Sequence, residues 1–156
     1  MEGAEVYRLV GEVVGVDDDC RDRDVLVAAI ATAARLQAWL EGRNVRLAAR
    51  LAEVTVRPSR VVADAARTSA RDADRVLDRA KTVDAIPALG EALDNGTVSG
   101  GHVDAVGRVL RQLEPCHREA LSSSAGWLLK LAATSTRPSC TRRLRARWTS
   151  SAPRTA

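Results

Sequence analysis

The histidines, serines and cysteines of the chain do not form a catalytic set. His102 stands two residues before Asp104, its nearest carboxylate, and residues two apart on a helix point to different faces. His117 follows Cys116 directly, which is poor geometry for a metal pair without further ligands. The run Ser122 to Ser124 has no His and Asp partners at a recognisable spacing. We therefore predict no catalytic residue, no metal site and no cofactor, and a structural role for His102.

The basic C-terminal segment is the only candidate for a nucleic-acid contact. After Glu119 the chain has seven basic residues and no acidic one, so residues 120–156 carry +7 and residues 1–119 carry −3 of the net charge of +4. Arginines can neutralise phosphates and a tryptophan can stack on a base. The candidate contacts are Arg137, Arg142, Arg143, Arg145, Arg147 and Trp148. The alternative, which we favour for residues 136–156, is a disordered tail of incidental composition.

A corner between two helices is the most specific local feature of the sequence. Asn95 and Gly96 both tolerate the left-handed conformation that ends a helix. Ser99 can accept a hydrogen bond from the free amides of the next helix, and His102 lies in the first turn of that helix. These four residues predict a structural corner in which one helix stops and another begins.

Helical periodicity dominates the remainder of the chain, and no alternation of period two persists long enough to indicate a sheet. We predict an all-α fold of about six helices, with one long N-terminal helix over residues 22–54 packed on a bundle of shorter helices. Residues 1–21 are expected to be a lead-in that contains at most a short helix, and residues 22–135 form the helical domain. Aromatic residues make up only 3% of the chain, so Ala, Val and Leu must fill the core.

The long helix has a stripe whose steps alternate between four and three residues. Its members are Leu26, Ile30, Ala33, Gln37, Leu40, Asn44, Leu47, Leu51 and Val54. Such a repeat keeps one seam facing a partner, and two copies of the chain could form a homodimer through Leu26, Ile30, Ala33, Leu40, Leu47 and Leu51. The other interpretation is that the stripe packs inside its own domain. We favour packing within the domain, because the repeat barely exceeds four heptads and Gly42 interrupts it.

Three consecutive segments resemble a known family. They are a helix over residues 68–80, an apolar helix over residues 86–93 and the corner from Asn95 to His102. This order resembles the actinobacterial domain of unknown function number 222 (DUF222), also called the 13E12 repeat family, over roughly residues 22–135. Its members usually show a Ser-x-x-x-Ala helix, an apolar helix that ends in a Gly-x-Ile/Val-Ser corner, and a His a few residues later. The resemblance implies a helical domain of the kind that stands ahead of an HNH endonuclease module.

The nuclease module of that family does not follow in this sequence. Its chemistry needs a His that polarises water and a metal that stabilises the phosphate being cleaved. The only histidines here are His102 and His117, so the resemblance does not extend to nuclease activity. Family members continue past the position of Thr136 with an acidic amphipathic helix, whereas this chain becomes rich in arginine. We hypothesise a frameshift near Thr136, and a shifted reading frame that encodes nothing like an HNH module would contradict it.

Two functions from different classes are consistent with the sequence. The first is a non-catalytic helical domain whose inherited role is DNA association or support of a nuclease module. The second is a self-associating helical interaction protein with no nucleic-acid role. Three cysteines without C-x-x-C spacing, charge-free runs of only about ten residues and an acidic start favour a cytoplasmic location over a secreted or membrane one.

Overall fold

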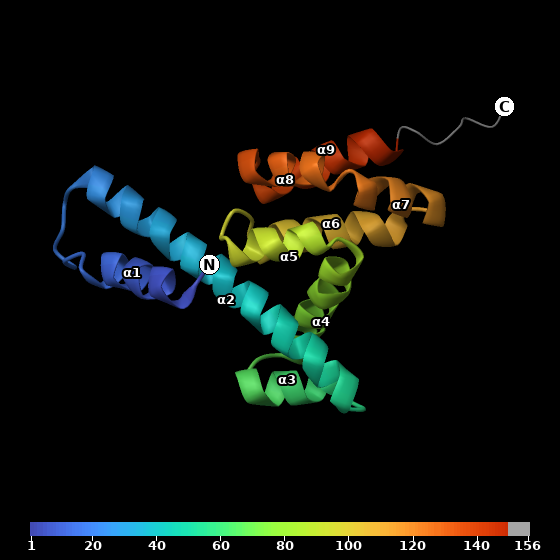
Figure 1. Cartoon of the computed structure of the whole chain (residues 1–156), viewed down its shortest axis with the longest axis horizontal. Helices are drawn as coiled ribbons and strands as arrows, with labels where there is room; N and C mark the ends of the chain where they lie inside the picture. The colour runs from blue at the N-terminus through green and yellow to red at the C-terminus, as the bar shows by residue number, and fades with distance from the viewer. Residues whose placement is uncertain (150–156) are drawn as a thin grey trace.

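The computed structural model describes residues 1–149 and contains, within that range, nine α-helices and no strand (Figure 1). The helices are α1 (Gly3–Val14), α2 (Arg23–Val54), α3 (Pro58–Ala66), α4 (Ala70–Ala85), α5 (Pro87–Asp94), α6 (Gly100–Gln112), α7 (Pro115–Ser123), α8 (Ala125–Thr134) and α9 (Arg137–Thr149). The all-α prediction is confirmed. The expected number of about six helices is too low, because the lead-in is helical, residues 115–134 divide at Ser124, and a further helix follows Thr136.

Side chains and prolines at the helix starts explain where several of these helices begin. Asp22 caps α2 by accepting hydrogen bonds from the amides of Asp24 and Val25 at 2.9 and 3.2 Å. Ser69 caps α4 by accepting from the Asp72 amide at 3.1 Å, and its hydroxyl donates to the Asp72 carboxylate at 2.7 Å. That donated hydrogen bond holds the pKa of Asp72 below its ordinary value. Prolines that need no amide partner occupy the first positions of α3, α5 and α7.

The hydrophobic core lies between α5, α6, α8 and α9. Its members are Ile86, Leu89, Ala92, Leu93, Val98, Val103, Val106, Val109, Leu110, Leu113, Leu121, Leu128, Leu131, Ala132, Cys140 and Leu144. Most are the apolar residues that recur every three or four positions in the sequence of α5, α6 and α8. The core contains no aromatic ring, although two tryptophans, Trp127 and Trp148, pack against its edge.

Most of the α2 stripe lies on the solvent side of the helix, so the expectation that it packs inside its own domain is wrong. Ile30, Leu40 and Leu47 are 68, 52 and 62% exposed. The buried positions of α2 are instead Ala38, Gly42, Val45 and Ala48.

A physical reason for this orientation is the close approach of α2 to α5. A Cβ atom added at Gly42 would lie 3.2 Å from the Cβ of Leu93, so only a glycine fits without a shift. The stripe of small residues that includes Gly42 therefore packs inward. Gly42, which interrupts the four-three repeat, thus lies in the face that packs on α5.

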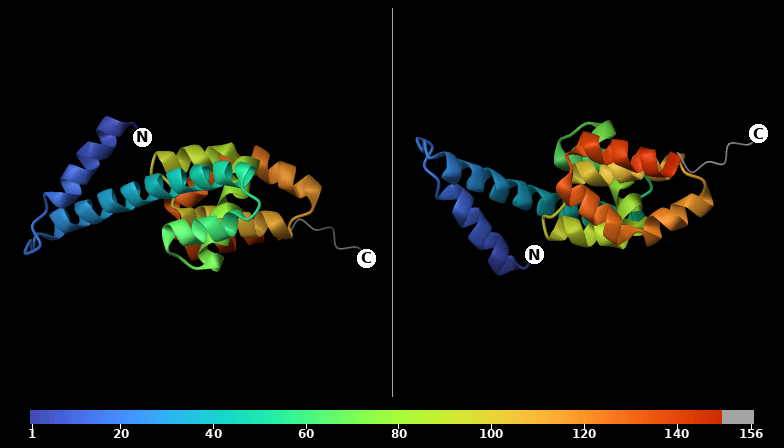
Figure 2. Two further views of the ribbon diagram at one scale, coloured as in Figure 1. Left: turned by 90° about the horizontal axis from the view of Figure 1, so that it is seen from below. Right: turned by 90° about the horizontal axis from the view of Figure 1, so that it is seen from above.

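The first two helices form a hairpin that extends away from the other helices (Figure 2). In this hairpin α1 runs antiparallel to the N-terminal half of α2, whereas the C-terminal half of α2 packs on α4 and α5.

By length and composition alone, α2 contains a segment that could cross a membrane. Its most apolar 18-residue window has a mean hydropathy of 1.2, and only 11% of that window is buried. Core helices and signal sequences satisfy the same criterion. The cytoplasmic location therefore stays a prediction.

Candidate functional site

The corner between α5 and α6 is built on a left-handed glycine. Gly96 has a φ of +68°, and the Thr97 amide and hydroxyl both donate to the Ala92 carbonyl, at 2.9 and 3.1 Å. The glycine also lies against the backbone of α2. A Cβ atom at Gly96 would stand 3.0 Å from the Arg35 carbonyl oxygen and 3.1 Å from its Cα. The corner therefore requires glycine both for its conformation and for its contact with α2.

His102 joins the start of α6 to the connection between α8 and α9. Its Nδ1 accepts from the Ser99 amide at 3.3 Å and lies 3.0 Å from the Ser99 hydroxyl, and its Nε2 lies 2.9 Å from the Ser135 carbonyl oxygen. Because Nδ1 accepts from an amide, the ring proton belongs on Nε2 and is donated to Ser135. Both ring nitrogens are thus engaged in contacts that hold three helices together.

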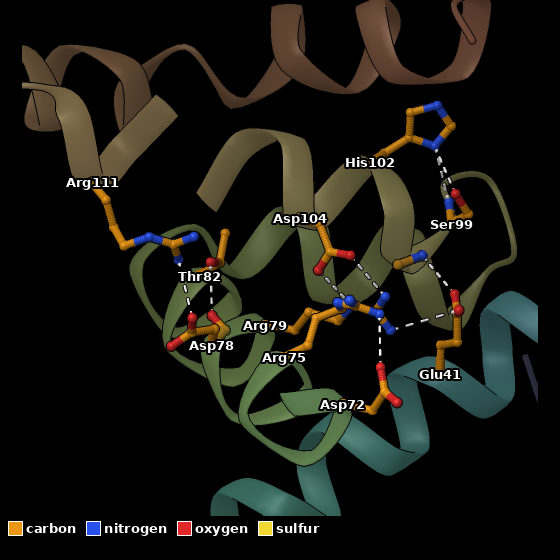
Figure 3. Close-up of polar contacts among 11 residues, drawn as sticks. Glu41, Asp72, Arg75, Asp78, Arg79, Thr82, Ser99, His102, Asp104 and Arg111 are labelled. Atoms are coloured by element: carbon orange, nitrogen blue, oxygen red, sulfur yellow. Dashed lines mark hydrogen bonds and ion pairs between the residues drawn. The ribbon is translucent and has the colours of Figure 1, made fainter. Parts of the chain in front are cut away.

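A cluster of partly buried charges lies next to this corner and was not anticipated from the sequence. Arg79 of α4 donates from Nε and Nη2 to the two carboxylate oxygens of Asp104 on α6, at 2.7 and 2.9 Å (Figure 3). Glu41 of α2 lies 3.6 Å from Arg79 Nη1 and accepts from the Gly100 amide at 2.6 Å. The three side chains of this charge cluster, Glu41, Arg79 and Asp104, are 23, 13 and 14% exposed.

The charge cluster satisfies polar groups that would otherwise be buried without partners. The bidentate hydrogen bonds to Asp104 raise the pKa of Arg79 above its ordinary value, despite the cost of burying the cation. Glu41 satisfies the first free amide of α6, so the N-terminus of that helix is capped by a side chain from α2. The cluster therefore positions three helices, and its hydrogen-bonding groups are directed at one another.

A groove between α4 and α6 continues outward from the charge cluster. It has a volume of about 390 Å³ and is lined by Arg71, Asp74, Arg75, Asp78, Arg79, Thr82, Asp104, Gly107, Arg108 and Arg111. Three of its five arginines are paired: Arg79 as described, Arg75 with Asp72 at 3.0 Å, and Arg111 with Asp78 at 3.5 Å. Most of the arginines that line the groove are thus neutralised by ion pairs within the protein.

The basic segment after Thr136 is a helix over residues 137–149, which corrects the expectation of a disordered tail there. Cys140 and Leu144, four residues apart on α9, are 1 and 0% exposed in the core. Trp148, another four residues on, is half-buried against the same core. Residues 150–156 of the expected tail lie outside the described residues.

The candidate contact residues on α9 differ in their surroundings. Arg142, Arg143, Arg145 and Arg147 are exposed. The guanidinium of Arg147 lies 4.5 Å from the centre of the Trp127 ring and 5.9 Å from that of Trp148. Trp148 packs inward with its Nε1 buried, so its ring is not free to stack on a base. The side chain of Arg137 lies outside the described part of the chain.

The docking of α9 predicts that the Cys140 thiol is protected. In a variant whose only cysteine is Cys140, we expect reaction with a thiol reagent to be at least about tenfold slower than in a variant whose only cysteine is the half-buried Cys20. Burial excludes the reagent and raises the pKa of Cys140, which lowers its thiolate fraction. Absorbance of the released thiolate measures both rates, and urea should make them equal. Equal rates without urea would show that α9 is not docked.

The other chemically reactive residues are not brought together. Ser123 and Ser124 donate their hydroxyl hydrogens to the carbonyls of Glu119 and Ala120, both at 2.9 Å. Residues 1–149 contain no group of three or more His, Cys, Asp or Glu side chains placed to hold a metal ion. His117 is half-buried on α7, and the side chain of Cys116 is outside the described structure.

Comparisons with known proteins give no relative. No model of a known protein family, no curated protein and no solved structure matches the chain.

Proposed function

We propose that this chain is a non-catalytic helical domain that associates with nucleic acid through the exposed arginines of α9, in a role that supports a nuclease module. The observation that carries the proposal is a docked helix with four exposed arginines, Arg142, Arg143, Arg145 and Arg147, in a segment where no acidic residue follows Glu119. Opposite charge on the nucleic-acid backbone attracts such a surface without any need for base recognition.

The docking of α9 supports this role because it fixes the arginines in space. A helix anchored by Cys140 and Leu144 holds its exposed side chains on a rigid element. Contacts made by such arginines would go to phosphates, which orient a protein on a duplex and carry little sequence information. We therefore expect binding that depends strongly on salt and weakly on sequence.

Titration of short duplex DNA at several salt concentrations tests the proposal. The variant Arg142→Ala/Arg143→Ala should bind more weakly and should lower the slope of log affinity against log salt by about 2, since each lost phosphate contact removes about 0.9. The matched control is Arg71→Ala/Arg108→Ala, which removes the same charge from exposed residues of the α4–α6 groove.

Three results would contradict the proposal. They are no binding at low salt, an unchanged slope for the α9 variant, and a larger loss for the groove control than for the α9 variant.

The alternative function is a self-associating helical protein with no nucleic-acid role. The exposure of the α2 stripe, with Ile30 and Leu47 both more than 60% exposed, favours self-association. If the protein forms a stable dimer and does not bind DNA, self-association is the function that the results support.

A further inference from the structure

The hairpin of α1 and α2 leaves much apolar surface uncovered. Leu9 is its only large side chain that is fully buried among the described residues. Tyr7 and Val14 of α1 are 81 and 77% exposed, and Val27 and Ile30 of α2 are 53 and 68% exposed. A hairpin of two helices has too little interior to bury both apolar faces, so this surface needs a further partner.

Most of the exposed apolar residues of both helices lie on one face of the hairpin. Arg35 pairs with Glu5 at 3.2 Å, and Thr32 bonds to Glu12 at 3.5 Å, which fixes how α1 and α2 are rotated against each other. At 100° per residue, these polar contacts occupy one side of the hairpin. The opposite side then carries Tyr7, Val10 and Val14 from α1 and Leu26, Ile30 and Leu40 from α2.

The apolar surface continues along α2 beyond the hairpin. Leu47 and Leu51 extend the stripe and line a groove of about 700 Å³ between α2, α3 and α4. The other side of that groove is formed by small and β-branched residues, among them Val62, Ala65, Ala66 and Val76. One apolar face, which we call the α1–α2 face, therefore runs from Tyr7 to the groove.

We propose that the α1–α2 face is covered by the same face of a second copy of this chain, with the two α2 helices antiparallel. This inference does not depend on the proposed nucleic-acid binding. The spacing of the stripe from Leu26 to Leu51 is 4-3-4-3-4-3-4, which reads the same in both directions. An antiparallel pair therefore places Leu26 opposite Leu51 and Ile30 opposite Leu47 of the second copy, with the twofold axis between Gln37 and Leu40.

The charges at the two ends of α2 favour the antiparallel orientation. The connection before α2 carries Asp17, Asp18 and Asp19, which are all exposed. Two exposed arginines stand just beyond the other end: Arg57, and Arg60, which also lies 3.9 Å from Asp64. Antiparallel helices bring each acidic tip to the basic end of the second copy, whereas parallel helices would bring the two acidic tips together.

The area of the α1–α2 face suits a dimer. From Leu26 to Leu51 the stripe spans about 38 Å at 1.5 Å per residue, and α1 adds about two turns beside it. With helices about 11 Å wide, each copy contributes about 540 Å² and the pair buries about 1,100 Å². Specific interfaces need about 1,000 Å² in total, so this face is large enough.

Sedimentation equilibrium of the full chain tests the dimer. We expect the unmodified protein to be a dimer and Ile30→Asp/Leu47→Asp to raise the dissociation constant by about 100-fold or more, since each buried charge acts twice in a symmetric interface. Both residues are exposed in the monomer, so its fold and its far-UV circular dichroism should not change. Ala31→Asp is the control, because Ala31 is an exposed residue of α2 that lies outside the stripe.

A strictly monomeric unmodified protein, or an equal effect of Ala31→Asp, would overturn the proposal. So would a monomer that binds vesicles of phosphatidylcholine and phosphatidylserine through Ile30 and Leu47, because the occupant would then be a lipid surface.

The orientation is tested with a spin label on Cys20, at the tip of the hairpin, in a Cys116→Ser background that leaves Cys140 buried. In the antiparallel dimer the two labels are separated by about 37 residues of helix, which is about 55 Å. Pulsed electron paramagnetic resonance should therefore give a long distance. A distance under about 20 Å would overturn the antiparallel arrangement, since parallel helices bring the two tips together.

Discussion

Replacement of Arg79 by methionine is expected to lower the free energy of unfolding by about 3 kcal/mol. Methionine keeps much of the volume of the side chain but removes the cation between Asp104 and Glu41. The two carboxylates are only 14 and 23% exposed, so they would remain largely buried without their partner. Removal of one member of a buried ion pair typically costs about 3 to 5 kcal/mol, and the partial exposure of Glu41 places this case at the lower end. Urea denaturation followed by circular dichroism measures the change.

Arg75→Met is the matched control for this prediction. Arg75 is one turn earlier on α4 and pairs with Asp72, but both side chains are 48% exposed. Solvent screens such an exposed pair, so this variant should lose much less stability than Arg79→Met does. If Arg79→Met lost as little as Arg75→Met, the charge cluster would not be what holds α2, α4 and α6 together.

Most of the core could be predicted from the sequence because its helices follow a simple apolar period. Leu89 and Leu93 of α5, and Val103 and Val106 of α6, recur at three- or four-residue spacing and are buried. Large apolar residues at this spacing form a stripe wide enough to specify which face turns inward.

The same apolar spacing predicts the wrong buried face for α2, because the spacing is read from large residues. In this helix, the buried positions Ala38, Gly42, Val45 and Ala48 are small, and their value lies in close approach to α5 rather than in their own apolar area. The spacing of apolar residues in a sequence gives no information on how closely the backbones of two helices approach. Apolar spacing alone therefore predicts that the larger stripe from Leu26 to Leu51 is the packing face of the domain.

The segment after Thr136 differs from its prediction for another reason. The density of arginine after Thr136 suggested disorder, although Cys140, Leu144 and Trp148 recur every four residues and form a narrow apolar stripe. That spacing was the available signal for α9. The charge cluster left no such signal, since Glu41, Arg79 and Asp104 come from three helices that only the tertiary fold brings together.

Gly96→Ala is expected to lower the free energy of unfolding by about 3 kcal/mol, which combines two independent costs. A left-handed conformation costs a residue with a Cβ about 1 to 2 kcal/mol. The new Cβ would also stand 3.0 to 3.1 Å from backbone atoms of Arg35, so the corner must move away from α2, and such overpacking typically costs about 1 to 3 kcal/mol. Thermal unfolding should show a melting temperature lower by about 6 to 12 °C.

Two further variants separate these costs. Gly11→Ala is the control, because a Cβ at Gly11 meets nothing within 4 Å, and this helical substitution should stabilise the protein by about 0.5 to 1 kcal/mol. Gly96→Asn keeps the contact with Arg35 but tolerates the left-handed conformation better than alanine does. If the contact dominates, asparagine and alanine at position 96 will destabilise equally, and if the conformation dominates, asparagine will recover about 1 kcal/mol. A loss of less than 1 kcal/mol for Gly96→Ala would show that α2 does not lie against the corner.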